Sequence, residues 1–446
     1  MRHADTIAAI ATSPGRAGIG VVRVSGPATR EIASGVLGRS LQPRMATLCD
    51  FRDAQSGVLD RGIAILYRAP HSYTGEDVLE LQGHGGPAVL QLVLRRCLAL
   101  GARPAQPGEF TQRAFLNDKL DLAQAESVAD LIDASSEAAA RGAMRSLVGE
   151  FSGRVGQMNQ TLIELRSLIE AALDFPEEEI DVLDRSGALR KLEHLREGVK
   201  DLLARAEQGR ILRDGAKVVL IGEPNVGKSS LLNRLAEQEV AIVTEMPGTT
   251  RDPLRFELTI DGVPVHVVDT AGLRDATDVV EKIGIQRAWR EIEQADLVLL
   301  IVDASAAHVD GYLQILAELP KNLQKILIFN KIDILGRAPT ETLTNSGSRI
   351  WLSAKTGQGL ELLRSAILRS IGWTATQEGN FIARERHLQA LRETVKFLNL
   401  AAAEVGSLEL MAEALRLAQY ALGNITGKFS ADDLLGEIFS RFCIGK

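Results

Sequence analysis

The sequence predicts a chain of mixed class, in which a small α+β domain precedes a helical domain that is interrupted by a P-loop α/β domain. Three observations support this prediction. An apolar run at 218–221 leads directly into a glycine-rich loop and the start of a helix. Helical patterns rich in Ala, Leu, Glu and Arg lie on both sides of that region, and short strand patterns occupy the first 119 residues. At 446 residues, the chain has room for two or three cores.

Changes of pattern along the chain predict four segments. We expect an N-terminal domain over 1–119, helical parts over 120–213 and 374–446, and the α/β domain over 214–373. The helices expected in the two helical parts cover 123–150, 151–173, 182–206, 384–405, 408–422 and 430–442. Because no strand pattern interrupts the last three, we expect them to pack with the first three. The α/β domain is then an insertion, and the apolar stripes of the helices form a bundle core.

Composition indicates a cytoplasmic globular protein. Charged residues make up 24% of the chain and hydrophobic residues 45%, and the net charge of −7 argues against a broad basic surface that coats nucleic acid. A local basic patch stays compatible with that charge. The longest apolar run, near 297–302, is far shorter than the ~20 residues that span a bilayer, so no membrane partner is expected. Three cysteines without a CxxC pair support neither a disulfide framework nor a zinc site.

The N-terminal segment shows strand patterns that contain two unexpected charges. Strands are predicted at 6–12, 19–25, 58–67 and 77–81, and helices at 87–100 and 108–116. Arg23 and Glu80 each stand inside an otherwise apolar strand, where an unpaired buried charge is costly. Either the two side chains are exposed or paired with each other, or they contact a ligand, and the pattern leaves both interpretations open.

The stretch from Gly222 to Ser229 is a complete phosphate-binding loop. Its two glycines allow the backbone to curl so that N–H groups point at phosphate oxygens, and a helix N-terminus faces the same anion. Lys228 is expected to reach the β- and γ-phosphates, and the Ser229 hydroxyl to bind Mg²⁺. The residues expected to contact GTP in this loop are Asn225, Val226, Gly227, Lys228, Ser229 and Ser230.

Two further segments are expected to form the switch that responds to the γ-phosphate. Thr250 can give Mg²⁺ a second hydroxyl, Asp269 can hold the water shell of the metal, and the Gly272 N–H can meet the γ-phosphate. The residues expected to contact GTP in these segments are Thr244, Glu245, Met246, Pro247, Gly248, Thr249, Thr250, Asp269, Thr270, Ala271 and Gly272.

The NKID stretch after the strand at 326–329 predicts that the base is guanine. The Asp333 carboxylate can accept two hydrogen bonds from guanine, N1–H and the exocyclic amino group, which adenine does not offer. Asn330 and Lys331 are expected to brace the ring and its loop, and Ser353, Ala354 and Lys355 to close over O6. A GTP-binding module that has lost hydrolysis stays an alternative.

The expected hydrolytic groups differ from those of small signalling GTPases, because Leu273 stands where those proteins carry the glutamine that orients water. The loop residue Asn225 and the segment 244–249 resemble potassium-dependent GTPases, in which K⁺ replaces an arginine finger. The expected K⁺ ligands are Asn225, Thr244, Met246 and Thr249. Glu281 is a candidate to orient water. Alternatively, Asn225 is only a loop residue and Glu281 one of many surface glutamates.

Several motifs together resemble one family over essentially the whole chain. They are DTIAAIAT, PGRAGIGVVRVSG, PGEFTQRAFLNDKLDLAQAE, GEPNVGKSSLLN, PGTTRD, DTAGLR and the terminal CIGK. These stretches are similar to the MnmE (TrmE) family of tRNA-modifying GTPases. The resemblance implies an enzyme that works with the FAD-containing protein MnmG. It implies that they add a carboxymethylaminomethyl group at C5 of the wobble uridine, U34, of certain tRNAs, with 5-formyltetrahydrofolate or a related folate as one-carbon donor.

The resemblance also implies site residues and assembly. By motif, the folate contacts are Arg23, Glu80, Lys119 and Lys446, with Arg23 and Glu80 facing the folate rather than each other. The resemblance implies that Glu281 orients the attacking water and that Lys228 and Asn225 are the other catalytic residues. It implies a homodimer through the N-terminal domains, GTP-dependent approach of the GTPase domains, and a heterotetrameric or larger complex with MnmG. Cys443 is typical of the family, and a lone thiol with no stabilised thiolate suits a structural or substrate-contacting role at least as well as catalysis.

Two alternative functions share the GTPase motifs. A ribosome-assembly GTPase of the Era or EngA kind would add a KH-like module or a second GTPase, and the sequence shows neither pattern. A GTP-switched scaffold without chemistry on RNA agrees with the acidic net charge. Folate binding by residues 1–119 separates the modification enzyme from both.

Overall fold

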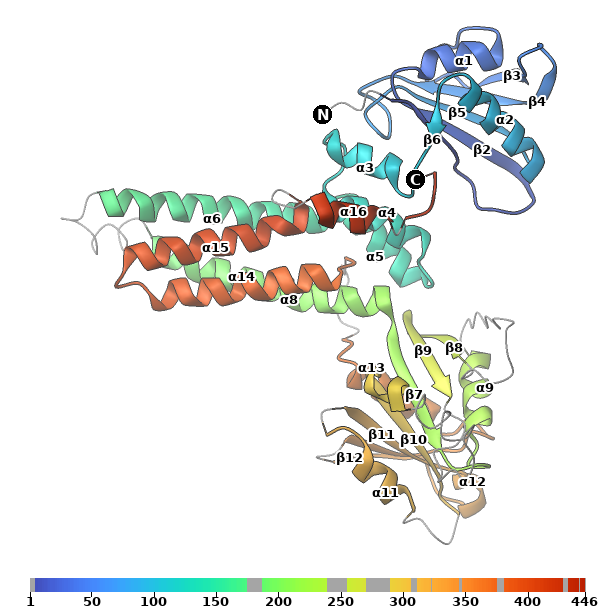
Figure 1. Cartoon of the computed structure of the whole chain (residues 1–446). Coiled ribbons are helices and arrows are strands. Elements are labelled where there is room, and N and C mark those ends of the chain that lie inside the picture. The colour runs from blue at the N-terminus through green and yellow to red at the C-terminus, as the bar shows by residue number, and fades with distance from the viewer. Residues whose placement is uncertain are drawn as a thin grey trace. The chain divides into compact units, whose positions relative to one another are not determined.

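The computed structural model describes most of the chain as two compact units. Described are residues 5–174, 187–238, 255–269, 289–305, 311–321, 323–344, 347–374, 381–427, 432–440 and 442–445. One unit contains 1–132, 146–199 and 390–446, and the other contains 133–145 and 200–389. Figure 1 shows the elements of both units. Among the described helices, none has the length and apolarity that crossing a membrane requires.

The first unit contains a six-stranded sheet in the order β3-β4-β5-β2-β1-β6. Its strands are β1 Ile7–Ile10, β2 Ala17–Ser25, β3 Thr47–Arg52, β4 Val58–Tyr67, β5 Val78–Gly85 and β6 Arg103–Pro104. Neighbouring strands are antiparallel except β1 and β6. The four predicted strands are present. Strand β3 was not predicted, nor was the helix α1 (Thr29–Leu37), whereas α2 (Pro87–Ala99) and α3 (Glu109–Leu116) were.

Helices α1 and α2 cover one face of this sheet. Ile32 of α1 and Val93 of α2 pack with Val22 and Val24 of β2 in one hydrophobic core. Because successive side chains of a strand alternate between faces, Val21 and Arg23 of β2 lie on the other face. This alternation explains how a strand can bury a core and still present a charge.

The helices of this unit form a bundle to which residues 122–199 and 390–446 both contribute (Figure 1). Its elements are α4 Leu122–Ile132, α6 Glu150–Asp174, α15 Leu408–Thr426, α16 Asp432–Ser440, and parts of α8 Ala188–Asp214 and α14 Glu385–Ala403. Arg166 of α6 donates to Gln419 of α15 at 2.5 Å, and Arg196 of α8 donates to Asn399 of α14 at 3.0 Å. The C-terminal helices therefore pack with the earlier ones, as predicted.

The predicted helix over 123–150 is wrong as a single element. Helix α4 ends at Ile132, and a new helix, α5, covers Glu137–Leu147. The Ser136 hydroxyl accepts a hydrogen bond from Ala139 N at 3.1 Å, which supplies the start of α5 with a side-chain acceptor. The apolar spacing continues across the break, so periodicity alone did not reveal it.

The second unit contains a seven-stranded sheet in the order β12-β13-β11-β10-β7-β9-β8. Its strands are β7 Ala216–Gly222, β8 Arg255–Ile260, β9 Val263–Asp269, β10 Leu297–Asp303, β11 Gln324–Asn330, β12 Thr340–Thr344 and β13 Gly347–Trp351. Its described helices include α9 Lys228–Gln238, α11 Gly311–Glu318, α12 Ile332–Leu335 and α13 Leu360–Ser370. Strand β12 was not predicted. The apolar run at 240–243 also predicts a strand, and these residues lie outside the described ones.

The central strands of this sheet are buried on both faces. Val218 and Leu220 of β7 belong to the core that includes α9 and α13, whereas Val219 and Ile221 belong to the core on the α11 side. Strands β9, β7, β10, β11 and β13 run parallel, so their carboxyl ends lie at one edge of the sheet. Loops at that edge are where ligands bind in parallel α/β sheets.

Candidate functional site

The phosphate loop joins β7 to α9 at the carboxyl edge of the seven-stranded sheet. Asn225 and Gly227 have φ values of 65° and 98°, so the loop turns through left-handed conformations. A Cβ on Gly222 would lie 2.6 Å from Ile301 O, and one on Gly227 would lie 2.3 Å from Asn330 Nδ2. The glycines at these two positions therefore permit close approaches that any side chain would block.

Lys228 folds back over this loop. Its Nζ donates to Gly222 O at 2.6 Å and to Glu223 O at 3.2 Å. Lys228 is also the first residue of α9, and Leu231 N donates to Gly227 O at 2.9 Å in the first turn of that helix. The ammonium group and the positive end of the helix thus converge on the same loop, as a bound polyphosphate requires.

Asn330 joins the phosphate loop to the predicted base-binding loop. Its Nδ2 donates to Val226 O at 2.8 Å, and its Oδ1 accepts from Ala354 N at 2.9 Å. The residue is 3% exposed, so both bonds are shielded from water. Asn330 therefore fixes two binding loops relative to each other, a connection that the motif alone did not reveal.

The residues predicted to select guanine lie beside this connection. Ser353 Oγ donates to Asp333 Oδ1 at 2.6 Å, and Thr356 N donates to Ser353 Oγ at 3.2 Å. Lys331 has a φ of 69° and its Nζ lies 2.6 Å from Asp303 Oδ2. The predicted NKID and SAK segments are thus brought together at one edge of the sheet.

Asp303 holds Lys331 of the predicted base-binding loop, and the sequence motifs did not indicate this role. Burial disfavours its charged form, but hydrogen bonds from Lys331 and Ser305 outweigh burial and hold the pKa of the Asp303 carboxyl below its usual value. It ends β10 directly opposite Asn330, which ends β11. The available signal was its position at the end of an apolar strand, the same position that Asp269 has on β9.

Part of the predicted GTP site lies outside the described residues. This holds for Thr244, Glu245, Met246, Pro247, Gly248, Thr249, Thr250, Thr270, Ala271, Gly272 and Glu281. Of the predicted Mg²⁺ and K⁺ ligands, the structure describes Ser229 on the first turn of α9 and Asn225 in the loop. Asp269 is described as the last residue of β9, paired with Leu220 of β7.

Arg23 and Glu80 form a direct ion pair. Arg23 Nε and Nη2 lie 3.0 and 2.8 Å from Glu80 Oε1, because the two residues are opposite each other in the β2–β5 ladder. The expectation that they do not face each other is therefore wrong for this structure. The guanidinium also lies 5.7 and 5.8 Å from the ring centroids of Tyr73 and Phe110, and Nη1 donates to Gly445 O at 3.3 Å.

The C-terminal residues reach this ion pair as a short segment, 442–445. Ile444 pairs with Pro107 in an antiparallel bridge, and Gly108 N donates to Cys443 O at 3.4 Å. A Cβ on Gly445 would lie 2.5 Å from Ile10 O. Cys443 is exposed. The segment thus places the end of the described chain beside Arg23.

Of the two lysines predicted to contact folate, the structure describes only Lys119. Lys119 is exposed, and its Cε lies 3.3 Å from the point that a Cβ on Gly75 would occupy. Lys446 lies outside the described residues. The residues that the structure brings together are therefore Arg23, Glu80 and the backbone of Gly445.

A buried ionic network ties α3 to the N-terminal strand. Arg113 is fully buried and contacts Asp5 Oδ1 at 2.8 Å, Glu109 Oε1 at 3.0 Å and Glu76 Oε2 at 3.2 Å. Burial favours the neutral acids, but hydrogen bonds from Arg103 and Arg113 outweigh it and lower the pKa values of Asp5 and Glu109. The network therefore keeps these carboxylates charged in the folded protein.

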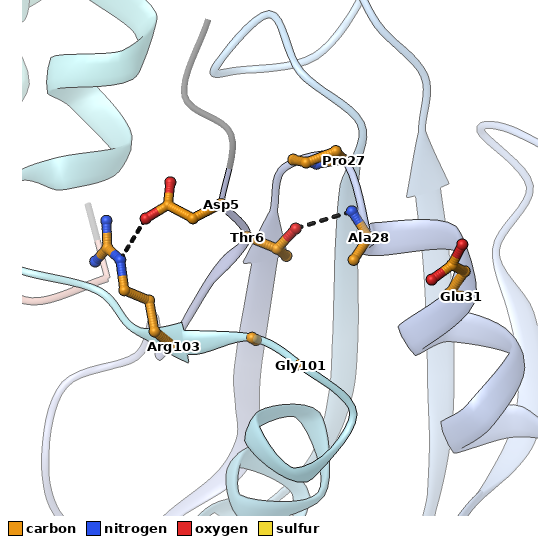
Figure 2. A pocket seen from close by; sticks show the side chains of 8 residues that line it. Asp5, Thr6, Pro27, Ala28, Glu31, Gly101 and Arg103 are labelled. Carbon is orange, nitrogen blue, oxygen red and sulfur yellow. Dashed lines mark hydrogen bonds and ion pairs between the residues drawn. The ribbon is translucent and has the colours of Figure 1, made fainter.

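A cavity of ≈ 550 Å³ lies beside this network (Figure 2). Figure 2 shows Arg103 reaching the Asp5 carboxylate, and the Thr6 hydroxyl accepting from Ala28 N. The cavity is lined by Asp5, Thr6, Pro27, Ala28, Glu31, Gly101, Ala102 and Arg103. No predicted folate residue is among them, so this cavity is distinct from the Arg23–Glu80 pair.

Comparison with known protein families shows to which family the chain belongs. Residues 6–119 match the model of the GTP-binding protein TrmE N-terminus, and residues 122–443 match the model of the MnmE helical domain. The chain belongs to the MnmE (TrmE) family. It is 58% identical over 446 residues to the tRNA modification GTPase MnmE of Azoarcus sp. (strain BH72), covering 100% of this chain and 99% of that protein. It is 56% identical over 445 residues to the MnmE of Neisseria meningitidis serogroup C, with coverage of 100% and 99%.

Solved GTPase structures resemble part of this MnmE-family chain. A single-residue variant of Aquifex aeolicus Era, bound to GDP·AlF₄⁻, is 26% identical with a TM-score of 0.29, covering 42% of this chain and 67% of that one. The G domain of T. maritima FeoB is 29% identical with a TM-score of 0.28, covering 35% of this chain and 98% of that one.

Proposed function

We propose that the chain is a potassium-activated GTPase that acts with MnmG on the wobble uridine of certain tRNAs. The proposal that the chain binds a guanine nucleotide rests on the two hydrogen bonds of Asn330. They join the phosphate loop to the segment of Ser353, which in turn contacts Asp333. Membership of the MnmE family supports the tRNA part, because its curated relatives are named tRNA modification GTPases. The proposed setting is the cytoplasm, as a homodimer assembled with MnmG.

The described residues fit a magnesium-bound guanine nucleotide. The Lys228 ammonium lies over loop carbonyls that a β- or γ-phosphate would replace as its partner. Ser229 is on the first turn of α9, where its hydroxyl would bind Mg²⁺. Asp333 would hold guanine through two hydrogen bonds, while Ser353 keeps the carboxylate oriented. Thr250, Asp269 and Gly272 are the proposed partners for the metal shell and the γ-phosphate.

We propose K⁺ as the group that replaces an arginine finger. When bound, it would stabilise negative charge that develops between the phosphates. Asn225 fits this role because its left-handed backbone, with φ of 65°, belongs to the phosphate loop itself. Thr244, Met246 and Thr249 are the other proposed ligands, and Glu281 is proposed to orient water.

Replacing K⁺ by Na⁺ is expected to slow GTP hydrolysis at saturating GTP by more than about tenfold, since an arginine finger contributes even larger factors. The rate is measured as phosphate release at constant ionic strength. An Asn225→Ala variant is expected to lose the difference between the two salts. Equal wild-type rates in KCl and NaCl would contradict the potassium assignment while leaving guanine binding intact.

The Arg23–Glu80 pair fits a folate. A guanidinium beside two aromatic rings suits a ring system that carries a carboxylate tail, and Glu80 could accept hydrogen bonds from the amino group of a pterin. Binding would exchange the internal ion pair for ligand contacts. Lys119 and Lys446 are proposed additional contacts, and Cys443 stays a proposed substrate-contacting residue.

The deciding experiment is nucleoside analysis of tRNA from cells that lack this protein. We expect C5-carboxymethylaminomethyl uridine derivatives to disappear, and to return when the intact gene is restored. A parallel titration of the purified protein with 5-formyltetrahydrofolate should show binding that Glu80→Gln weakens. Unchanged tRNA nucleosides would exclude the modification function, and absence of folate binding would favour one of the two alternatives, a ribosome-assembly GTPase or a GTP-switched scaffold.

A further inference from the structure

A histidine and an aspartate form a pair at the end of β5 that the proposed function does not use. His84 Nδ1 lies 2.7 Å from Asp60 Oδ1, and His84 N donates to Asp60 Oδ2 at 2.8 Å. The Asp60 side chain is 8% exposed, whereas that of His84 is 72% exposed. The carboxylate is therefore buried and the imidazole it contacts faces solvent.

The local sequence is adapted to this contact. A Cβ on Gly83 would lie 2.2 Å from Asp60 Oδ2, so a larger residue there would push the carboxylate away. A Cβ on Gly85 would lie 2.5 Å from Ala17 O, where β2 and β5 approach closely. The absence of side chains on both sides of His84 thus leaves room for the Asp60 carboxylate and for the close approach of β2, while the His84 side chain is exposed.

The pair determines which imidazole nitrogen is available for chemistry. Burial favours the neutral acid, but hydrogen bonds from His84 and from Arg61 N outweigh it and lower the pKa of Asp60. A charged carboxylate only accepts hydrogen bonds, so Nδ1 must carry the proton that it donates to Asp60. The lone pair of the neutral ring then lies on Nε2, as in histidines that act as general bases.

His84 shares a sheet face with the proposed folate residues. Glu80, Gln82 and His84 alternate along β5, so they lie on the face that also carries Arg23. Four residues of a strand span about 13 Å, which places His84 within reach of a ligand extended from the Arg23–Glu80 pair. Ile63, which is opposite Gln82 on β4, adds an apolar surface between the two ends.

We propose that His84 is a proton-transfer residue of the reaction on this face, and that Asp60 is its positioning residue. The inference rests on the proposed function, whose product contains a new C–N bond between a one-carbon unit and an amine that carries a carboxymethyl group. As the amine lone pair forms that bond, the π electrons of the acceptor carbon move to its heteroatom. The amine N–H bond breaks, its electrons stay on nitrogen, and the proton moves to His84 Nε2. Asp60 stabilises the resulting imidazolium, which returns the proton to water.

The test measures the initial rate of uridine modification in an extract from cells that lack this protein, supplemented with purified wild type or variants. His84→Gln and His84→Ala keep the backbone N–H that Asp60 accepts, so the fold is retained. We expect both to lower the rate about 100-fold, the typical contribution of a general acid or base. Added imidazole should restore part of the rate of His84→Ala, and GTP hydrolysis should stay within about twofold of wild type.

Two further variants separate catalysis from structure. His71→Gln is the matched control, because His71 is an exposed histidine of the same sheet region. It should behave as wild type. Asp60→Asn should lower the rate without rescue by imidazole, and combining it with His84→Ala should cost no more than His84→Ala alone.

The possible outcomes distinguish this inference from the proposed function. Wild type that restores modification together with a fully active His84→Gln would overturn the role of His84 and leave the proposed function standing. Slow variants that imidazole does not rescue would make His84 structural, which also overturns the inference. Wild type that restores no modification would overturn both.

Discussion

The two sheets of the molecule place the proposed functional side chains in opposite ways. In the seven-stranded sheet, Asn330 and Asp303 stand at strand ends, Lys228 stands at the start of the helix that follows β7, and the strand interiors are apolar. In the six-stranded sheet, Arg23 and Glu80 stand in the middle of strands. The difference follows from burial: a parallel sheet covered on both faces leaves only its edge for chemistry. The second face of the six-stranded sheet is covered only in part, because Ile7 and Ala9 pack with Phe110 of α3 while Ile63 of β4 is exposed.

The sheets also differ in how their polar groups affect stability. In the six-stranded unit, Arg113 is buried among three carboxylates and supports the fold itself. In the seven-stranded unit, Lys228 contacts loop carbonyls at a partly exposed edge. Substitutions should therefore unfold the first unit and inactivate the second, and the predictions below test that contrast.

Arg113→Met should give the largest effect. It removes the buried cation that contacts Asp5, Glu76 and Glu109, while Asp5 and Glu109 keep Arg103. Breaking a buried ion network in this way costs about 3–5 kcal/mol of unfolding free energy. Hydrogen exchange of the β1 and β2 amides during urea titration measures the loss. Arg141→Met, which removes an exposed ion pair on α5, is the control and should cost less than about 1 kcal/mol. Equal losses in the two variants would remove the distinction between the sheets.

Lys228→Ala should lower GTP hydrolysis by at least about 100-fold, because it removes a positive charge aimed at the phosphates. Its unfolding free energy should change by less than about 1 kcal/mol, since the ammonium contacts only exposed or partly buried loop carbonyls. Lys200→Ala on the exposed side of α8 is the matched control. A strongly destabilised but catalytically normal Lys228→Ala protein would reverse the proposed contrast.

Asp333→Asn should weaken GTP binding by about 10- to 100-fold, the value of a charged hydrogen bond of about 1.5–3 kcal/mol. The same variant should bind xanthosine triphosphate more tightly than GTP, because an amide can donate to the extra carbonyl of xanthine. Competition binding with the two nucleotides measures the change. An unaltered preference for guanine would show that another edge residue selects the base.

Lowering the pH should weaken the six-stranded unit more than the other one. The folded pKa values of Asp5 and Glu109 lie below their unfolded values, so both groups stabilise the fold above about pH 4.5. That stabilisation is lost as the pH falls through the folded pKa values. Unfolding measured at pH 5, 4 and 3 should show this loss, with a smaller pH dependence in Glu109→Gln. The exposed Glu137→Gln serves as control and should keep the wild-type pH dependence.

The sequence allowed the edge of the seven-stranded sheet to be predicted more completely than the face of the six-stranded one. The proposed phosphate- and base-binding residues form short contiguous motifs, so Lys228, Asn330 and Asp333 could be named as candidates from spacing alone. The pairing of Arg23 with Glu80 depends instead on the register of two strands, in which the paired residues are 57 positions apart. Strand β3, with its mixed sequence TLCDFR, gave no clear alternation to predict it.

Contacts between distant segments were equally invisible in the sequence. Helical spacing predicted α3, but the partners of Arg113 come from that helix and two other parts of the chain. The break between α4 and α5 depends on Ser136, which a continuous apolar pattern obscured. Local motifs report local geometry, whereas register and long-range ion pairs emerge only when the whole domain is assembled.

The position of the segment 442–445 has a consequence for biosynthesis. Arg23 donates a hydrogen bond to Gly445 O, and Gly445 is translated 422 positions after Arg23. Strand β2 therefore leaves the ribosome long before one of the contacts of its arginine can form. Until Gly445 is synthesised, the Arg23–Glu80 pair lacks this neighbour. A protein truncated by a premature stop codon, even one that has a finished GTPase region, would therefore lack the Gly445 contact to Arg23.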